Sequence, residues 1–316
     1  MSIPPPPKHL QIALRKSALS LCHAEYIRGC LLALYPACEI VLRGITTQGD
    51  RIIDRSLADI GGKGLFIEEI ETAMTEGRAD LAVHSLKDMP MDMAEGFTIA
   101  AVPLREDPRD ALVSNRFSTI EMLPTGTVVG TSSLRREAQL RELNPGVTVR
   151  MLRGNVPTRI RKLDEGEYDA IILATAGLNR LEYGNRIAAC LEPEKFLPAV
   201  GQGALALECR SDRPDVIAML APLVDVATLL AVTAERAFSC ALSGSCRTPL
   251  AGHAVFRGEE LWLRGLLASR DGTNVMRGER SVQLSASGED LSVADALGGA
   301  LGDEFLARGA ASLLAA

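Results

Sequence analysis

The first two hundred residues alternate short apolar runs with segments whose apolar positions recur at helical spacing. Residues 10–15 (LQIALR) and 38–47 (CEIVLRGITT) have the apolar, β-branched character of strands, and 17–34 between them keeps one apolar helical face. A helix over 63–77 and a short strand over 81–83 continue the alternation. This order predicts an α/β domain with helices on both faces of a sheet.

A second α/β segment begins near Asp110 and repeats this alternation. Its predicted elements are strands at 127–130, 147–152 and 169–174, and helices at 133–143 and 156–165. The run ALALE at 204–208 is a further strand, and the sequence alone does not identify the sheet it joins.

The pattern changes after Pro222. A helix over 226–242 is followed by strands at 250–256 and 261–268, a third β-type segment, and a final helix over 291–314. Sequential strands without helices between them predict a small α+β domain with a three-stranded antiparallel sheet. The predicted domains are 1–103 with 204–222, then 104–203, then 223–316.

Composition places the chain among globular proteins. Hydrophobic residues make up 47% of the 316 positions and charged residues 23%, which is close to the globular average. The net charge of −6 argues against a general nucleic-acid binder, and no apolar run approaches the roughly 18 residues of a membrane span. Because the start is proline-rich rather than apolar, we expect no secretory signal. Seven irregularly spaced cysteines suit a reducing, cytoplasmic compartment.

Cations are concentrated in one stretch of this acidic protein. Between Thr131 and Leu163 eight cations face only two anions, a local charge of +6. Seven of the eight are arginines, whose planar fork binds carboxylates or phosphates in pairs of hydrogen bonds. Ser133 and its neighbours lie at a predicted helix start, a favourable place for an anion. An anion-binding site and a solvated basic face explain this charge about equally well. The cations are Arg135, Arg136, Arg141, Arg150, Arg153, Arg159, Arg161 and Lys162.

A second candidate is the sequence VHSLKDMP at 83–90. Pro90 restricts Met89 to extended conformations, so Lys87 and Asp88 are expected on a fixed turn after a strand. A carboxylate at such a strand end can act as a general acid or base or bind a cationic substrate. A surface Lys–Asp pair without function is the alternative.

Two loops complete the candidates. Cys246 lies in the run SGSCRT, where small neighbours predict an accessible loop and Arg247 favours the thiolate; an inert surface thiol is the alternative. Cys240, earlier on the preceding helix, is expected in the core. The run GGKGLF at 61–66 has neither phosphate-loop nor dinucleotide-fold spacing, and it predicts a mobile flap in which Lys63 reaches a ligand. No metal site is expected.

Taken together, these segments resemble the porphobilinogen deaminase family, also called hydroxymethylbilane synthases. The similar stretches follow the family's order over more than 200 residues. They are GGKGLFIEEIE (61–71), AVHSLKDMP (82–90), GTSSLRREAQL (130–140), LRGNVPTRIRKLDEGEYDAIILATAGLNRL (152–181), AVGQGALALE (199–208) and the Cys246 loop. The resemblance implies two α/β domains of the type II periplasmic-binding-protein kind, followed by the small third domain.

The family resemblance also implies an activity. The family joins four porphobilinogen molecules head to tail into hydroxymethylbilane, releases four ammonia molecules, and primes the chain on a dipyrromethane cofactor. The resemblance makes Asp88 the catalytic carboxylate and Cys246 the residue that carries the cofactor through a thioether. It also places Lys63 and Phe66 on the flap and implies a monomer. Substrate and cofactor carboxylates would be bound by Arg15, Ser17, Lys87, Ser133, Arg135, Arg136, Arg153, Arg159 and Arg180.

Two positions depart from the family pattern. Ser245 replaces a glycine before Cys246, and Lys16 replaces a glutamine between Arg15 and Ser17. Neither change removes a charged or nucleophilic group, so we expect activity to survive. The competing interpretations are a non-catalytic anion-binding protein of the same two-lobed fold and a single-strand nucleic-acid binder. Aromatic residues make up only 4% of the chain, which argues against base stacking in the latter.

Overall fold

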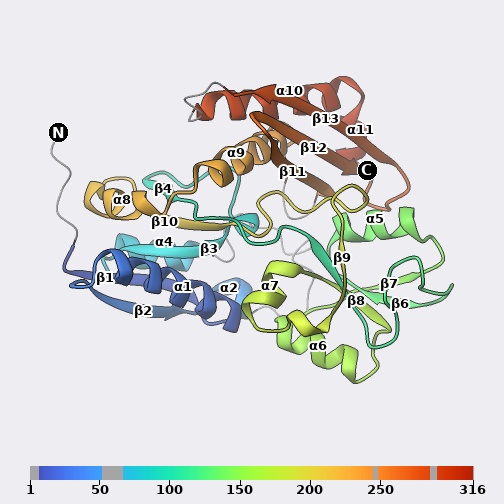
Figure 1. The fold of residues 1–316 in the computed structure, drawn as a ribbon, viewed down its shortest axis with the longest axis horizontal. Coiled ribbons are helices and arrows are strands. Elements are labelled where there is room, and N and C mark those ends of the chain that lie inside the picture. Colours follow the sequence, from blue (N-terminus) through green and yellow to red (C-terminus); the bar gives the residue numbers. More distant parts are fainter. Residues whose placement is uncertain (1–6, 52–66, 245–247, 285–289, 316) are drawn as a thin grey trace. The chain divides into compact units, whose positions relative to one another are not determined.

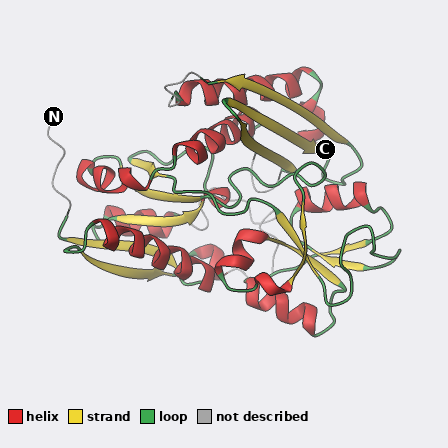
Figure 2. Ribbon diagram, viewed as in Figure 1, coloured by secondary structure: helices red, strands yellow, loops and turns green. Residues whose placement is uncertain are grey.

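A computed structural model describes residues 7–51, 67–244, 248–284 and 290–315 of the chain (Figure 1). The chain divides into two compact units. Unit 1 contains Met1–Arg105 and Ala204–Thr228, and unit 2 contains Glu106–Gly203 and Leu229–Ala316. Helices and strands alternate along most of unit 1 and along the first part of unit 2 (Figure 2).

Unit 1 is built on a five-stranded mixed sheet with the order β2-β1-β3-β10-β4. β1 is parallel to β2 and β3, whereas β10 is antiparallel to β3 and β4. The strand predicted at 204–208 therefore belongs to this sheet, although it follows the last strand of the next sheet in sequence. The elements are β1 (His9–Arg15), α1 (Ala18–Leu34), β2 (Glu39–Ile45), α2 (Gln48–Arg51), α4 (Glu68–Thr75), β3 (Leu81–Ser85), η1 (Leu86–Asp88), β4 (Phe97–Ala101), β10 (Leu205–Arg210), α8 (Pro214–Leu220) and η3 (Ala221–Leu223).

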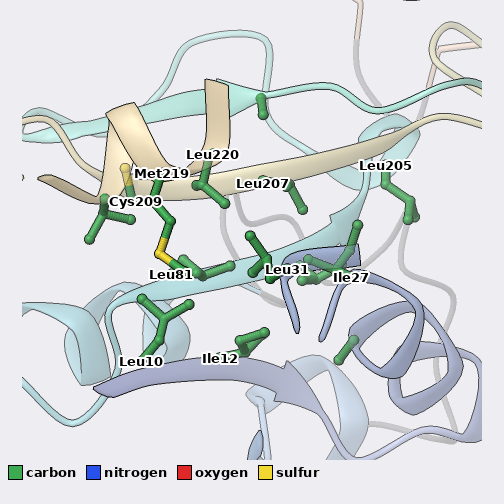
Figure 3. Packing of buried hydrophobic residues seen from close by; sticks show 14 of the residues in the cluster. Leu10, Ile12, Ile27, Leu31, Leu81, Leu205, Leu207, Cys209, Met219 and Leu220 are labelled. Carbon is green, nitrogen blue, oxygen red and sulfur yellow. The ribbon is translucent and has the colours of Figure 1, made fainter. Parts of the chain in front are cut away.

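Alternate residues of these strands bury opposite faces of the sheet. On one face, Leu10, Ile12 and Leu81 pack with α1 and α8 in a cluster whose members are almost fully buried (Figure 3). On the other face, the small Ala13 and Ala82 lie with α4. Each large aliphatic side chain buried in this way contributes about 1.5–3 kcal/mol, so the strand positions are fixed by their apolar pattern.

Unit 2 holds two sheets. The first is mixed, with the order β7-β6-β8-β5-β9, and the second is antiparallel, with the order β11-β12-β13. The elements are β5 (Asp110–Val113), β6 (Val128–Gly130), α5 (Leu134–Leu143), β7 (Thr148–Arg150), α6 (Val156–Asp164), β8 (Ala170–Ala174), α7 (Thr175–Arg180), η2 (Gly184–Arg186), β9 (Ile187–Leu191), α9 (Val226–Ala241), β11 (Leu250–Arg257), β12 (Glu260–Ala268), β13 (Val275–Gln283), α10 (Leu291–Ala307) and α11 (Ala310–Ala315).

Glycines let α9 approach the antiparallel sheet closely. A Cβ atom on Gly265 of β12 would lie 2.5 Å from the ring of Phe238 on α9. Phe238 in turn meets Phe305 of α10 edge to face, with ring centroids 5.1 Å apart. These contacts anchor the end of α9, the helix that precedes Cys246 in the sequence.

The predicted fold class, two α/β sheets and a three-stranded antiparallel sheet, is confirmed. Two local predictions are wrong. The final helix over 291–314 is two helices, because Gly309 adopts a φ of +92° that ends α10. Cys240 is exposed rather than in the core. The predicted division of the chain into three domains stays a prediction.

Candidate functional site

The carboxyl ends of β1 and β3 form a recess of about 70 Å³ in unit 1. The two strands are parallel, so their carboxyl ends meet at the same edge of the sheet, where ligands bind in open α/β folds. Polar side chains from three segments reach this recess. It is lined by Arg15, Ser17, Leu19, Ser20, His23, Ile67, Val83, His84, Ser85 and Asp88.

One wall of the recess is the start of α1. Ser17 is the N-cap of this helix, and its hydroxyl accepts a hydrogen bond from the backbone N–H of Ser20 at 3.2 Å. The Ser20 hydroxyl accepts from the backbone N–H of Arg15 at 3.0 Å. A helix start carries partial positive charge, and the half-buried Arg15 adds a full one. This wall is suited to a carboxylate.

The turn that carries Lys87 and Asp88 also contributes to the recess, through Asp88. Leu86 and Met89 are buried on either side of the pair, and the backbone N–H of Leu86 donates to the carbonyl of Ala204 at 3.0 Å. Met89 is extended, with φ −73° and ψ 142°, as the following proline requires. The predicted fixed turn is confirmed. It leaves the Asp88 carboxylate exposed and Lys87 half-buried.

A buried histidine–glutamate pair near this recess was not predicted from the sequence. Nε2 of His84 on β3 donates to Oε2 of Glu208 on β10 at 2.8 Å, and both side chains are buried. Glu71 of α4 is close to Glu208, and burial followed by the charge and hydrogen bonding of Glu208 raises the pKa of Glu71 to about 7. The sequence does contain one indication of this pair, because Glu208 is an acidic residue in the otherwise apolar strand predicted at 204–208.

In unit 2 two of the predicted anion-binding arginines, Arg135 and Arg136, contact a carboxylate of the protein itself. Asp110, at the start of β5, is fully buried. It accepts from Nη1 of Arg135 at 2.7 Å, from Nε and Nη2 of Arg136 at 2.9 and 2.7 Å, and from Gln202 at 3.0 Å. Burial alone raises the pKa of Asp110, but the two guanidinium groups outweigh it and hold that pKa well below the ordinary value.

Both arginines are themselves almost completely buried, with exposed fractions of 4% for Arg135 and 7% for Arg136. Arg135 also donates to the carbonyl of Leu197 at 2.7 Å, and Arg136 to that of Ile172 at 2.9 Å. Because α5 begins here, this network fixes the helix start where Ser133 caps the backbone N–H of Arg136. The positive charge of these two side chains is therefore partly neutralised within unit 2.

The remaining predicted arginines of unit 2 are half-buried and lie near helix ends and loops. Nε of Arg159 donates to the carbonyl of Gly154 at 2.7 Å, and Nη2 of Arg180 to that of Gly203 at 3.1 Å. Arg153 lies in the loop between β7 and α6. Asn155 caps α6 in the way that Ser133 caps α5, since its side chain accepts from Thr158 at 2.9 Å.

Three predicted site residues, Lys63, Phe66 and Cys246, lie outside the described residues. The flanks of the Cys246 loop are described. The backbone N–H of Gly244 donates to the carbonyl of Ser239 at 2.7 Å, and Pro249 accepts from Ala268 at 2.9 Å. The described residues on both sides of 245–247 therefore have hydrogen-bonded backbone.

The described residues contain neither a metal-ligand cluster nor a single helix that could span a membrane. Among them, no group of three or more His, Cys, Asp or Glu side chains is placed to hold a metal ion. No single described helix is long and apolar enough to cross a membrane; one pair, Pro214–Leu223 and Val226–Ala241, passes by length and composition but is bent by 108°.

Comparisons with known proteins agree over nearly the whole chain. A family model described as porphobilinogen deaminase, dipyrromethane cofactor binding domain, matches residues 10–218, and one for the C-terminal domain of the same family matches 229–307. A porphobilinogen deaminase of Burkholderia thailandensis is 54% identical over 98% of this chain and 92% of its own length. One of Nitrosomonas europaea is 54% identical over 98% of both chains. Among solved structures, the periplasmic aliphatic sulphonate binding protein SsuA of Escherichia coli matches 75% of this chain and 71% of its own, at 14% identity and a TM-score of 0.40.

Proposed function

The chain belongs to the porphobilinogen deaminase family, and from that premise we propose that porphobilinogen reacts at the recess between Arg15 and Asp88. The activity is that of the family: four porphobilinogen molecules are joined head to tail into hydroxymethylbilane, four ammonia molecules are released, and one water molecule supplies the terminal hydroxyl of the product. The observation that carries the proposed site is the convergence of a guanidinium, a helix start and an exposed carboxylate at one sheet edge.

The side chains of this chain suit a dipyrromethane cofactor. Each pyrrole ring carries an acetate and a propionate, and carboxylates are matched by guanidinium groups, hydroxyls and helix starts. Arg15, Ser17 and Lys87 offer such donors in unit 1. In unit 2 they are offered by Ser133, Arg135, Arg136, Arg153, Arg159 and Arg180. When bound, the cofactor supplies the pyrrole end from which the product grows, and Cys246 is the proposed point of attachment.

Asp88 is the proposed catalytic residue. In porphobilinogen the bond between the aminomethyl carbon and its ammonium nitrogen breaks, the electron pair leaves with ammonia, and a resonance-stabilised cation remains on the ring. An exposed carboxylate at the recess stabilises that cation electrostatically and accepts the pyrrole N–H. A pyrrole α-carbon then captures the cation and loses its proton, which Asp88 would accept in this proposal.

The ion pairs with Asp110 hold the guanidinium groups of Arg135 and Arg136 in fixed positions, which favours ligand binding. A guanidinium that is already fixed by a buried carboxylate loses little side-chain freedom when it binds a ligand carboxylate. Arg135 and Arg136 would therefore bind the cofactor or early product as preorganised groups. The more exposed Arg153 and Arg159 would bind carboxylates added later.

Asp88→Asn tests the proposal. The variant retains the shape of the turn but removes the charge, so we expect turnover, measured as ammonia released from porphobilinogen, to fall by about 10²–10³-fold. Glu95→Gln, an exposed acid in the loop that follows, is the matched control and should keep wild-type turnover. Near-normal ammonia release by Asp88→Asn would refute the role of Asp88.

The attachment role of Cys246 has its own test. The intact mass of protein made in cells that produce porphobilinogen should exceed the sequence mass by one dipyrromethane, and Cys246→Ser should abolish the excess. An unmodified wild-type mass would instead favour a non-catalytic anion-binding protein. We further propose that the protein acts as a monomer in the cytoplasm; light scattering that gives a dimer mass would contradict the former.

A further inference from the structure

Three ionisable side chains from three elements meet on the α4 face of the unit 1 sheet. They are Glu71 of α4, His84 of β3 and Glu208 of β10. In the antiparallel pairing of β3 with β10, Glu208 is opposite Ala82 and His84 is opposite Ala206. Directly opposed residues project to the same face, so His84 and Glu208 are diagonal neighbours across the two strands. Ala82 belongs to the cluster packed with α4, which places all three on the α4 side.

Glu208 is the most deeply buried of the three. It has no exposed surface, and its Oε2 accepts from His84 at 2.8 Å. Among the described residues, its other oxygen, Oε1, is buried and has no hydrogen-bond donor other than a protonated Glu71. Burying a carboxylate with one oxygen unpaired is costly, and an apolar residue would fill this strand position without that cost. Glu208 is therefore better suited to a functional role than to stabilising the fold.

Glu71 is the nearby group that can relieve this cost. Burial and the neighbouring carboxylate raise the pKa of Glu71 to about 7, so Glu71 is protonated at pH values below neutrality. A protonated Glu71 is a hydrogen-bond donor toward Glu208. The other ionisable groups on α4 and on the same side of the neighbouring strands are Glu68 and Glu69 of α4, Arg210 at the end of β10, and His9 and Arg15 at the two ends of β1. Nη1 of Arg210 donates to a carbonyl at the end of α4, at 3.4 Å.

His84 connects this acid pair to the reaction site. His84 lines the same recess as Asp88. The strand that carries His84, β3, continues directly into the turn with Lys87 and Asp88. With Nε2 held by Glu208, the imidazole ring is fixed in the recess wall. A change of charge on the acid pair is thus transmitted to the wall that faces the substrate.

We propose that Glu208 is a positioning residue for the deamination and condensation steps: it fixes His84 in the wall of the recess, and the proton on Glu71 keeps Glu208 in place as the acceptor. This role rests on the proposed function, because it assumes that the reaction takes place beside Asp88. Loss of the Glu71 proton puts a second negative charge next to Glu208 and disturbs its contact with His84. Activity should then fall as the pH rises through neutrality.

The first test compares glutamine variants by their steady-state kinetics. Glu208→Gln should lower kcat at least tenfold and leave KM within twofold, because the substrate contacts remain while the wall shifts. Glu71→Gln mimics the protonated acid and cannot ionise. Its kcat should equal that of the wild type at pH 6 and exceed it at least threefold at pH 8.5. Glu76→Gln, exposed at the end of α4, is the matched control and should follow the wild-type pH profile. A Glu71→Gln profile that superimposes on that of the wild type would overturn the proposal.

The second test does not depend on activity and keeps the proposal refutable if Glu208→Gln folds poorly. Carboxyl-carbon NMR of the folded holoenzyme should show Glu71 titrating near pH 7. In Glu208→Gln, or in Glu208→Ala if only that variant folds, the midpoint should fall by one pH unit or more. A wild-type midpoint near 4.5 overturns the proposal. A different result would refute the proposed function and leave the Glu71–Glu208 contact intact. That result is normal ammonia release by Asp88→Asn together with a Glu71 that still titrates near pH 7.

Discussion

Substitution of Asp110 by asparagine removes the only carboxylate that the described residues place against two buried arginines. Asp110 accepts four hydrogen bonds, three of them from the guanidinium groups of Arg135 and Arg136. The asparagine side chain has the same shape, but it carries no charge and presents an N–H₂ group where a donor already lies. Two positive charges then remain buried without a counterion.

The magnitude follows from the burial of the network. Removing one partner of a buried ion pair destabilises a protein by about 3–5 kcal/mol, because the other charge stays desolvated. For a unit of this size that corresponds to a fall of roughly 6–20 °C in Tm. The stability that Asp110→Asn loses should be largest near neutral pH and should decrease in acid. The pKa of Asp110 is lower in the folded protein than its usual value of about 3.9, so its stabilisation is complete above about pH 4 and is lost as the pH falls through the folded pKa.

The assay is urea unfolding followed by the fluorescence of Trp262, the single tryptophan of the chain, which lies in unit 2. Asp110→Asn should unfold at lower urea at pH 7, and its difference from the wild type should shrink below pH 4. Asp164→Asn is the control, since Asp164 pairs with Arg186 at the surface of the same unit and such pairs contribute about 1 kcal/mol or less. An Asp110→Asn midpoint equal to that of the Asp164→Asn control would refute the reasoning.

Two further substitutions probe the recess of unit 1 and the backbone at Gly203 of unit 2. Ser17→Ala removes the N-cap of α1 and should lower the free energy of unfolding by about 0.5–2 kcal/mol and raise KM for porphobilinogen. Ser17→Asp restores a cap but repels substrate carboxylates, so recovered thermal stability with a still higher KM is expected; a wild-type KM would contradict the anion-binding role. Gly203→Ala forces a φ of +87° on a residue with a Cβ that would lie 2.4 Å from the carbonyl oxygen of Glu106. It should cost about 1–3 kcal/mol in urea unfolding, and an unchanged midpoint would show that the backbone relaxes freely.

The sheets and the Asp88 turn were predictable because their determinants are local. The apolar alternation around Leu10 and Leu81 fixes strands, and Pro90 fixes the extended Met89 that follows the turn. The helix start at Ser133 was likewise predictable from the capping chemistry of its own side chain.

The partners of the buried charges were not predictable, because they come from distant parts of the chain. Glu208 meets His84 across 124 positions, and Asp110 meets Arg135 across 25. Spacing along the sequence showed a basic segment, but which of its arginines are buried depends on the packing of α5 on the sheet. An acidic residue in an apolar strand, as at 208, signals a buried partner without identifying it.

The most direct test of the account is the mass of the enzyme during the reaction. The holoenzyme incubated briefly with porphobilinogen should show discrete covalent species that increase by one substrate unit each, whereas Asp88→Asn should keep the mass of the dipyrromethane-bearing protein and add few or no further units. If Asp88→Asn built the same series at the wild-type rate, Asp88 at the recess would not be the carboxylate that carries the reaction.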